Sequence, residues 1–98
     1  MLVKIHNSYR TVVAICDNNL LGKKFEQDNK QIDLTSKFFQ GEEKTEQEVL
    51  EIMQNFSAED ATFNIVGKKS VDLALKTGLI KQEGIITIQD IPIALVLL

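Results

Sequence analysis

Two Gly-Lys-Lys segments are the residues whose types and spacing most suggest chemistry. They are Gly22-Lys23-Lys24 and Gly67-Lys68-Lys69, and the second opens a predicted helix. Backbone N–H groups at the start of a helix attract anions, so both segments invite comparison with a phosphate-binding loop. A P-loop needs a further glycine upstream, and Asp17 and Thr62 occupy the corresponding positions. Neither segment therefore predicts a nucleotide-binding loop.

The four lysines of these segments support a weaker prediction. Lys23, Lys24, Lys68 and Lys69 form one basic patch for an anionic partner if the fold brings them together. The alternative is four solvated lysines without a partner. Because the chain carries a net charge of -3, only such a local patch could bind RNA, and weakly.

The single histidine and the single cysteine, His6 and Cys16, could act as a base and a nucleophile. The hairpin predicted below places them on opposite faces, roughly 16 Å apart along the strand, which is far beyond hydrogen-bond reach. We therefore predict that Cys16 is a buried structural residue. One cysteine forms no internal disulfide and one histidine cannot supply a zinc site. The sequence predicts no catalytic set, no metal site and no cofactor.

Acidic residues concentrate in the segment 42–60, which holds seven Asp and Glu residues against one Lys. Paired acid–base groups or a divalent-cation site would be the functional interpretations. No calcium-binding loop is present, and the segment is too polar to indicate buried carboxylates. A solvated helix face is the interpretation that we favour.

Tyr9 and Arg10 form another candidate contact, because they lie at the tip of a predicted hairpin. Such exposed pairs contact protein or RNA partners in many complexes. An ordinary turn is the alternative.

Length and composition limit the class of protein. The 98 residues fit a single domain, and the net charge of -3 excludes a strongly basic protein that coats nucleic acid. The longest apolar run, Ile91–Leu98, is too short to span a membrane. No secretory signal is visible at the N-terminus. We expect a cytoplasmic protein without a membrane segment.

The first predicted element is an antiparallel hairpin of strands 2–7 and 10–17 around Ser8-Tyr9. A two-residue loop would place Val3 and Ile5 on one core-facing side together with Val12, Ala14 and Cys16. Residues 17–19, Asp-Asn-Asn, are predicted as a turn or a helix-capping cluster.

The remaining chain predicts strands, helices and a final hairpin, with one clear helix start. Thr45 and Glu48 form a capping box, and Gly78 ends the second helix. The predicted elements are strands 24–26 and 31–34, helix 45–56, strand 61–66, helix 68–77, and strands 85–88 and 91–96.

This order predicts an α+β domain over residues 1–98. We expect two layers, with a mixed and mainly antiparallel sheet and two helices packed on one of its faces. Residues 93–98 are apolar at alternate and intervening positions, which predicts a strand covered on both sides. Leu95 should then be buried.

Four short patches, spread over nearly the whole chain, share a pattern with a known family. They are residues 3–6 with 13–17, residues 20–26, residues 38–42, and residues 64–67 with 78–80 and the Ile-Pro segment. In these patches the chain resembles the small archaeal proteins grouped as domain of unknown function family 424. The resemblance implies an archaeal cytosolic source and an α+β fold, and it implies no activity. The family often has a histidine after the proline near the C-terminus, where this chain has Ile93.

Three functions follow as hypotheses. The first is a small non-enzymatic binding module in a protein or ribonucleoprotein assembly, with translation as the suggested process. The second is an enzyme or enzyme subunit whose site is completed by a partner or a ligand. A deep polar pocket near Gly22 or Gly67 would favour it. The third is a structural homodimer joined by an exposed sheet edge formed by residues 91–98.

Overall fold

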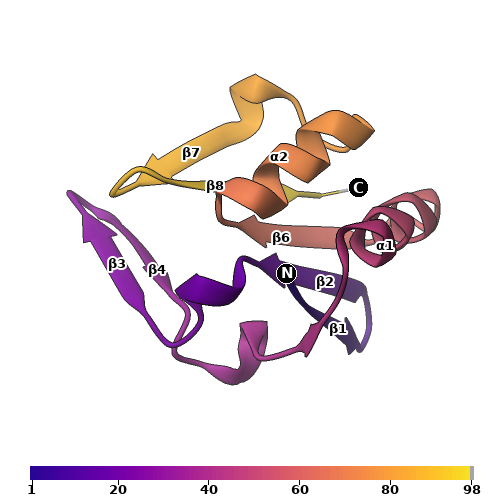
Figure 1. The fold of residues 1–98 in the computed structure, drawn as a ribbon, viewed down its shortest axis with the longest axis horizontal. Coiled ribbons are helices and arrows are strands. Elements are labelled where there is room, and N and C mark those ends of the chain that lie inside the picture. Colours follow the sequence, from indigo (N-terminus) through magenta and orange to yellow (C-terminus); the bar gives the residue numbers. More distant parts are fainter. Residues whose placement is uncertain (98) are drawn as a thin grey trace.

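A six-stranded sheet organises the chain, and a separate two-stranded hairpin packs beside it. The computed structural model describes residues 1–97, so Leu98 of the predicted C-terminal run lies outside the described residues. The strand order of the large sheet is β5-β1-β2-β6-β8-β7, and only β2 and β6 pair in parallel. Figure 1 shows both helices over the same side of this sheet.

The elements lie close to the predicted ranges. The strands of the large sheet are β1 (Leu2–Asn7), β2 (Thr11–Cys16), β5 (Glu42–Glu43), β6 (Thr62–Val66), β7 (Ile85–Ile88) and β8 (Ile91–Val96). The small hairpin is β3 (Lys24–Gln27) and β4 (Lys30–Asp33), and the helices are α1 (Glu46–Ala58) and α2 (Lys68–Thr77). Three short 3₁₀ helices are η1 (Asn18–Leu20), η2 (Lys37–Phe39) and η3 (Gln82–Gly84).

The predicted α+β architecture is confirmed, and it has two apolar clusters. The larger cluster joins residues of α1 and α2 to Val13, Phe63 and Ile65 of the central strands. A smaller cluster lies on the opposite face, where Ala14 and Cys16 pack with residues of the segment 20–39. Both faces of the central strands are therefore covered, although both helices lie on one of them.

The predicted register of the first hairpin is wrong by one residue. Asn7 pairs with Thr11, so the loop has three residues, Ser8, Tyr9 and Arg10. A shift of one residue moves a whole set of side chains to the other face. The side chains on the helix face are therefore those of Val3, Ile5, Val13 and Ile15, while Ala14 and Cys16 face the smaller cluster. Alternation could not fix the register, because β2 is apolar on both faces.

The prediction for the C-terminal strand is wrong in part. Ala94 and Val96 are buried against the helix side, but Leu95 is 56% exposed. The small hairpin β3–β4 contacts β7, but it does not bury Leu95. The prediction that residues 91–98 form an exposed edge of the sheet is wrong as well. The strand β8 lies between β6 and β7, so β7 is the edge strand on that side.

Pro92 lies inside β8 at the one place where its missing N–H costs little. Gly67 donates its N–H to the Pro92 carbonyl (2.9 Å), so Pro92 faces the end of β6. The Gly67 carbonyl, which would accept from a residue at this position, accepts instead from Val71 in α2 (2.9 Å). The proline therefore leaves no acceptor without a donor.

The capping box at the start of α1 is confirmed. Thr45 Oγ1 accepts from the Glu48 N–H (3.1 Å), and the Glu48 carboxylate accepts from the Thr45 N–H (2.9 Å). These hydrogen bonds hold the pKa of Glu48 below its ordinary value of 4.5.

Thr45→Ala is expected to lower the free energy of unfolding by about 0.5–2 kcal/mol, because the cap of α1 is lost. Urea melts measure this loss, and amide exchange of Glu48 and Val49 should accelerate. Since the folded pKa of Glu48 is lowered, its contribution is present above its unfolded pKa and is lost as the pH falls through the folded pKa. Unchanged exchange at both amides would show that the box does not support the helix start.

Candidate functional site

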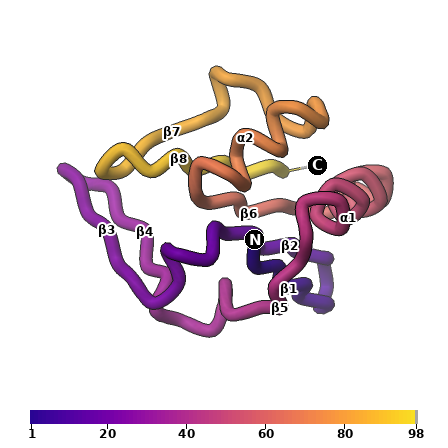
Figure 2. Tube along the Cα trace, viewed as in Figure 1, coloured from indigo at the N-terminus to yellow at the C-terminus, as the bar shows by residue number. Residues whose placement is uncertain are grey.

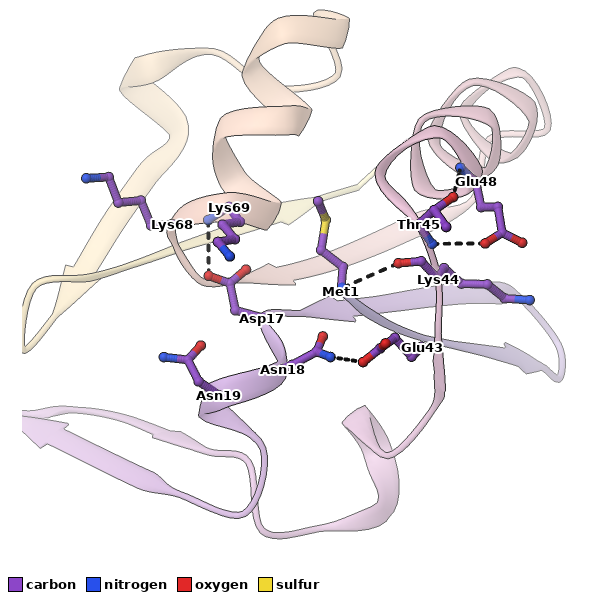
Figure 3. A pocket seen from close by; sticks show the side chains of 10 residues that line it. All are labelled: Met1, Asp17, Asn18, Asn19, Glu43, Lys44, Thr45, Glu48, Lys68 and Lys69. Atoms are coloured by element: carbon purple, nitrogen blue, oxygen red, sulfur yellow. Dashed lines mark hydrogen bonds between the residues drawn. The ribbon is translucent and has the colours of Figure 1, made fainter.

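A polar cleft of about 620 Å³ opens at the carboxyl ends of β2 and β6. Ligands of open sheets commonly bind beyond the carboxyl ends of parallel strands, where the chain diverges to different elements. Here β2 continues into η1, and β6 continues into α2. The lining residues come from four segments of the chain and are Met1, Asp17, Asn18, Asn19, Glu43, Lys44, Thr45, Glu48, Lys68 and Lys69. Figure 3 shows their side chains around the cleft.

Asp17 forms the floor of the α2 side of the cleft. Its carboxylate accepts from the N–H of Lys69 (3.1 Å), the N–H of Ser70 (2.9 Å) and the hydroxyl of Ser70 (2.7 Å). Asp17 is 7% exposed and Ser70 is fully buried. The carboxylate thus caps a helix that begins about 50 residues further along the chain.

Gly67 makes this close approach possible. Its φ is +111°, a backbone conformation that residues with a side chain rarely adopt. A Cβ at Gly67 would lie 2.4 Å from Cγ of Asp17. The glycine therefore serves both the turn from β6 into α2 and the contact with the capping carboxylate.

This arrangement changes the phosphate hypothesis for the second Gly-Lys-Lys segment. The anion that meets the first turn of α2 is already present in the protein, as the carboxylate of Asp17. The N–H groups of Lys69 and Ser70 therefore already donate to Asp17 and are not open for a phosphate. Any anion bound here must contact the lysine side chains.

The four candidate lysines do not all line the cleft. Lys68 and Lys69 lie at its rim, on the first turn of α2. Lys23 and Lys24 lie just before and at the start of β3, at a different place in the fold (Figure 1). Lys24 forms an ion pair with Glu26 (3.4 Å). Figure 3 shows the side chain of Lys69 beside Asp17, whereas that of Lys68 extends away from the other lining residues.

Lys68 and Lys69 are lysines of the cleft that form no ion pair in the described chain. Over residues 1–97 the ion pairs are Lys24–Glu26 and Lys44–Glu42 (3.2 Å), so neither Lys68 nor Lys69 is in an ion pair. Both lysines are exposed. Their ammonium groups are free to meet an anion from solvent.

The opposite wall comes from residues 43–48, which run from the end of β5 into the first turn of α1. Asn18 donates its side-chain amide to the Glu43 carboxylate, which ties η1 to β5. Glu48 is held in the capping box with Thr45. This wall is acidic, so the cleft presents positive charge from α2 and negative charge from its other side.

The carboxylates of the acidic segment are exposed, which agrees with a solvated face. Glu51 accepts from the side-chain amide of Gln47 in the same helix (3.3 Å), whereas Glu43 accepts from Asn18 of η1. No group of three or more potential metal-ligating side chains occurs in the part of the chain that the structure describes. The five glutamates considered as acid–base or cation-binding groups, Glu42, Glu43, Glu46, Glu48 and Glu51, are all exposed.

His6 and Cys16 share one face of the sheet, contrary to the prediction that they point to opposite faces. His6 pairs with Val12 because of the corrected register, so the two residues are still roughly 13 Å apart along the strand. The ring of His6 stacks on Phe38 and lies 2.9 Å from its carbonyl. Burial raises the pKa of the Cys16 thiol to about 11, and Asp17 adds to the shift. A thiol with such a pKa is a poor nucleophile, which agrees with a structural cysteine.

The first hairpin tip presents Tyr9 completely to solvent, with a relative exposure of 103%. Arg10 follows it in the three-residue loop and is also exposed. The tip lies at the opposite end of β2 from the cleft, because β2 begins at the loop and ends at Asp17. Tyr9 and Arg10 are therefore a second, separate contact candidate.

Sequence reasoning did not assign Asp17, Asn18 or Asn19 to a site. The prediction of a helix-capping cluster is correct for Asp17, but the helix that it caps is α2. The sequence contained one signal for this contact. Asp17 directly follows the apolar strand β2, and Gly67 directly follows the apolar strand β6. Only the parallel pairing of β2 with β6 brings the two together.

The sequence profile of a family described as "Protein of unknown function (DUF424)" matches residues 5–98. The chain belongs to this family. The match spans every element of the fold after the start of β1, which agrees with the resemblance in the patches noted above. No curated protein gives a significant match to the chain.

A solved structure with a similar fold comes from Methanopyrus kandleri and is described as an uncharacterized conserved protein. It is 19% identical to this chain, with a TM-score of 0.81 over 96% of this chain and 87% of the other. At this identity the likeness shows a shared fold and no shared activity. Among the described residues, no helix has the length and apolar character needed to cross a membrane.

Proposed function

We propose that this protein is a non-enzymatic binding module of the cytoplasm that contacts the phosphate backbone of an RNA in a ribonucleoprotein assembly. The supporting observation is the pair of exposed lysines, Lys68 and Lys69, which form no ion pair in the described chain and lie on the first turn of α2 at the rim of a polar cleft. Translation complexes, which expose much RNA backbone, are the first assemblies to test.

The contact is made by lysine side chains at the rim of the cleft. The N–H groups of Lys69 and Ser70 donate to Asp17 and do not bind the phosphate. The acidic wall at Glu43 and Glu48 repels phosphate from the interior of the cleft. Lysine ammonium groups act on phosphate as point charges and do not read a base sequence. The affinity is modest, because the chain as a whole carries a net charge of -3.

Binding of a fluorescent single-stranded RNA across a salt series tests this proposal. Lys68→Gln combined with Lys69→Gln removes both charges without adding a carboxylate beside Asp17. Two phosphate contacts account for about -1.4 in the slope of log affinity against log salt, and the double variant should lose this part. Its affinity at low salt should fall about tenfold or more.

The chain offers a matched control in its other lysine pair. Lys23→Gln combined with Lys24→Gln makes the same change in charge outside the cleft, and should leave affinity and slope nearly unchanged. An equal loss in both double variants would instead support the wider patch of all four lysines. Equal binding by the native chain and the variant of Lys68 and Lys69 would contradict the proposal.

An enzyme site completed by a partner or a ligand is the second candidate function. The observation that favours it is the polar cleft itself, which lies directly beside Gly67. Native mass spectrometry of the purified protein distinguishes this candidate. A small molecule retained by the native chain and lost from a variant with Asn18→Ala and Asn19→Ala would favour the enzyme.

A protein partner at the first hairpin tip is the alternative if RNA does not bind. Tyr9 is completely exposed there, and exposed aromatic side chains are enriched in protein interfaces. Affinity purification with mass spectrometry would then show proteins that depend on Tyr9 and Arg10 and do not depend on the lysines of α2.

A further inference from the structure

One face of the strands β7 and β8 carries a continuous strip of apolar side chains. Residues that pair across two strands share a face, and Ile86 pairs with Ile93 while Ile88 pairs with Ile91. Leu95 follows on the same face, because side chains alternate along β8. This face lies opposite both helices, since Ile91 and Ile93 pack against the smaller cluster. We call the five residues Ile86, Ile88, Ile91, Ile93 and Leu95 the apolar strip.

The apolar strip is buried at one end and exposed at the other. Ile88, beside the turn between β7 and β8, is 2% exposed, whereas Ile86 is 49% and Leu95 is 56% exposed. Ile91 and Ile93 are half-buried. The cover of the strip must therefore lie at its turn end.

The hairpin β3–β4 lies at this end. Both of its strands contact β7, and Figure 2 shows its tip beside the turn between β7 and β8. Two hydrogen bonds join the hairpin to this turn. The Gln89 N–H donates to Gln27 Oε1 (2.6 Å), and Nε2 of Gln89 donates to the Glu26 carbonyl (2.7 Å). We call these two hydrogen bonds the clasp.

The outer part of the hairpin is held weakly. Its strands form a sheet of their own, separate from the six-stranded sheet. Within β3 and β4 only Phe25 and Ile32 are shielded from solvent, and each is half-buried. Both hydrogen bonds of the clasp are exposed to water. Few buried apolar contacts and exposed hydrogen bonds are typical of a segment that opens locally.

The base of the hairpin, by contrast, is fixed. Leu34 is fully buried. The Gly22 N–H donates to the Leu34 carbonyl (2.8 Å), and the Leu34 N–H donates to the Lys23 carbonyl (2.8 Å). Leu20 and Phe39 hold the flanking segments in the smaller cluster. The tip can therefore move while the base stays in place.

We propose that the hairpin β3–β4 is a lid, which opens at its tip while its base and the large sheet stay folded. In the closed state the lid shields the turn end of the apolar strip, and the clasp holds it there. Opening extends the exposed part of the strip from Ile86 and Leu95 to Ile88 and Ile91. The protein thus alternates between a closed state and a state with a larger apolar surface.

Thiol labelling at two depths tests the lid. Ile88→Cys places a thiol under the tip of the lid, while the native Cys16 is fully buried with Leu34 at its base. When opening and closing are faster than labelling, the labelling rate follows the open population. Each rate is divided by the rate of the same thiol in the unfolded chain, and peptide mass spectrometry separates the two sites. Iodoacetamide should label the introduced thiol about tenfold or more faster than Cys16.

Gln27→Ala, made in the Ile88→Cys chain, removes one hydrogen bond of the clasp. The open population should rise, and the introduced thiol should react about threefold or more faster. Gln31→Ala is the matched control, because Gln31 is exposed in β4 and lies outside the clasp. Thr45→Ala weakens α1, which the lid does not involve. Both controls should leave the labelling rate of the introduced thiol unchanged.

Three results would overturn the proposal. The first is one common labelling rate for the introduced thiol and Cys16, which would mean that the chain opens only as a whole. The second is equal acceleration by Gln27→Ala and by either control. The third is exchange of the amides that pair β7 with β8 at the same open population, because the strand and not the lid would then move. Thermal melts confirm folding, and Ile91→Cys gives the same readout if Ile88→Cys does not fold.

Discussion

Asp17→Ala is expected to lower the free energy of unfolding by about 2–4 kcal/mol, one of the two largest effects among the substitutions considered. The side chain is 7% exposed and accepts three hydrogen bonds, two from backbone groups and one from Ser70. Hydrogen bonds to a charged group are stronger than neutral ones, and removing the acceptor leaves buried donors without a partner. The first turn of α2 should fray, and with it the position of Lys68 and Lys69.

Asp33→Ala is the matched control for this substitution. Asp33 also accepts from a backbone N–H and a hydroxyl, both of Thr35 (2.8 and 2.5 Å), but it is exposed. Its replacement should leave urea melts nearly unchanged, because water can replace the local contacts. Equal losses for Asp17→Ala and Asp33→Ala would show that the buried carboxylate does not hold α2 in place.

Gly67→Ala is expected to cost about 3–5 kcal/mol. Two causes add: a φ of +111° is strained for alanine, and its Cβ would lie 2.4 Å from Cγ of Asp17. Backbone strain of this kind costs about 1–3 kcal/mol, and the contact forces the capping carboxylate away from α2. Gly78→Ala is the control, since its φ of +80° is also positive but no atom lies within 4 Å of the added Cβ. It should cost about 1–2 kcal/mol.

The double variant of Gly67 and Asp17 separates the two causes. If the contact with Asp17 contributes, Gly67→Ala should cost less in a chain that already carries Asp17→Ala, because the atoms in conflict are gone. Strictly additive losses in chemical denaturation would leave backbone strain as the sole cause.

Local signals predicted the elements well. The capping box placed the start of α1 at Thr45, and the periodicity between Gly67 and Gly78 gave the full extent of α2. The strands β7 and β8 also have the predicted bounds. Such signals depend on residues that are neighbours in sequence, so they remain valid without knowledge of the fold.

Features that depend on distant residues were harder to predict. The hairpin register required the loop length, which an apolar strand such as β2 does not reveal. Leu95 was predicted to be buried because its strand is apolar on both sides, yet nothing packs over that part of the face. Asp17 meets α2 only because β2 and β6 lie side by side. Lys68 and Lys69 were identified as candidates, while their relation to Asp17 needed the structure.

Amide chemical-shift mapping tests the central claim most directly, namely that the rim of the cleft at α2 is the binding surface. The uniformly ¹⁵N-labelled native chain is titrated with a short single-stranded RNA at low salt. The account predicts that the largest shifts fall at Lys68 and Lys69, with smaller ones at Asn18 and Asn19, and that all of them diminish as salt is added. Shifts centred on Tyr9, or a spectrum that RNA leaves unchanged, would contradict it.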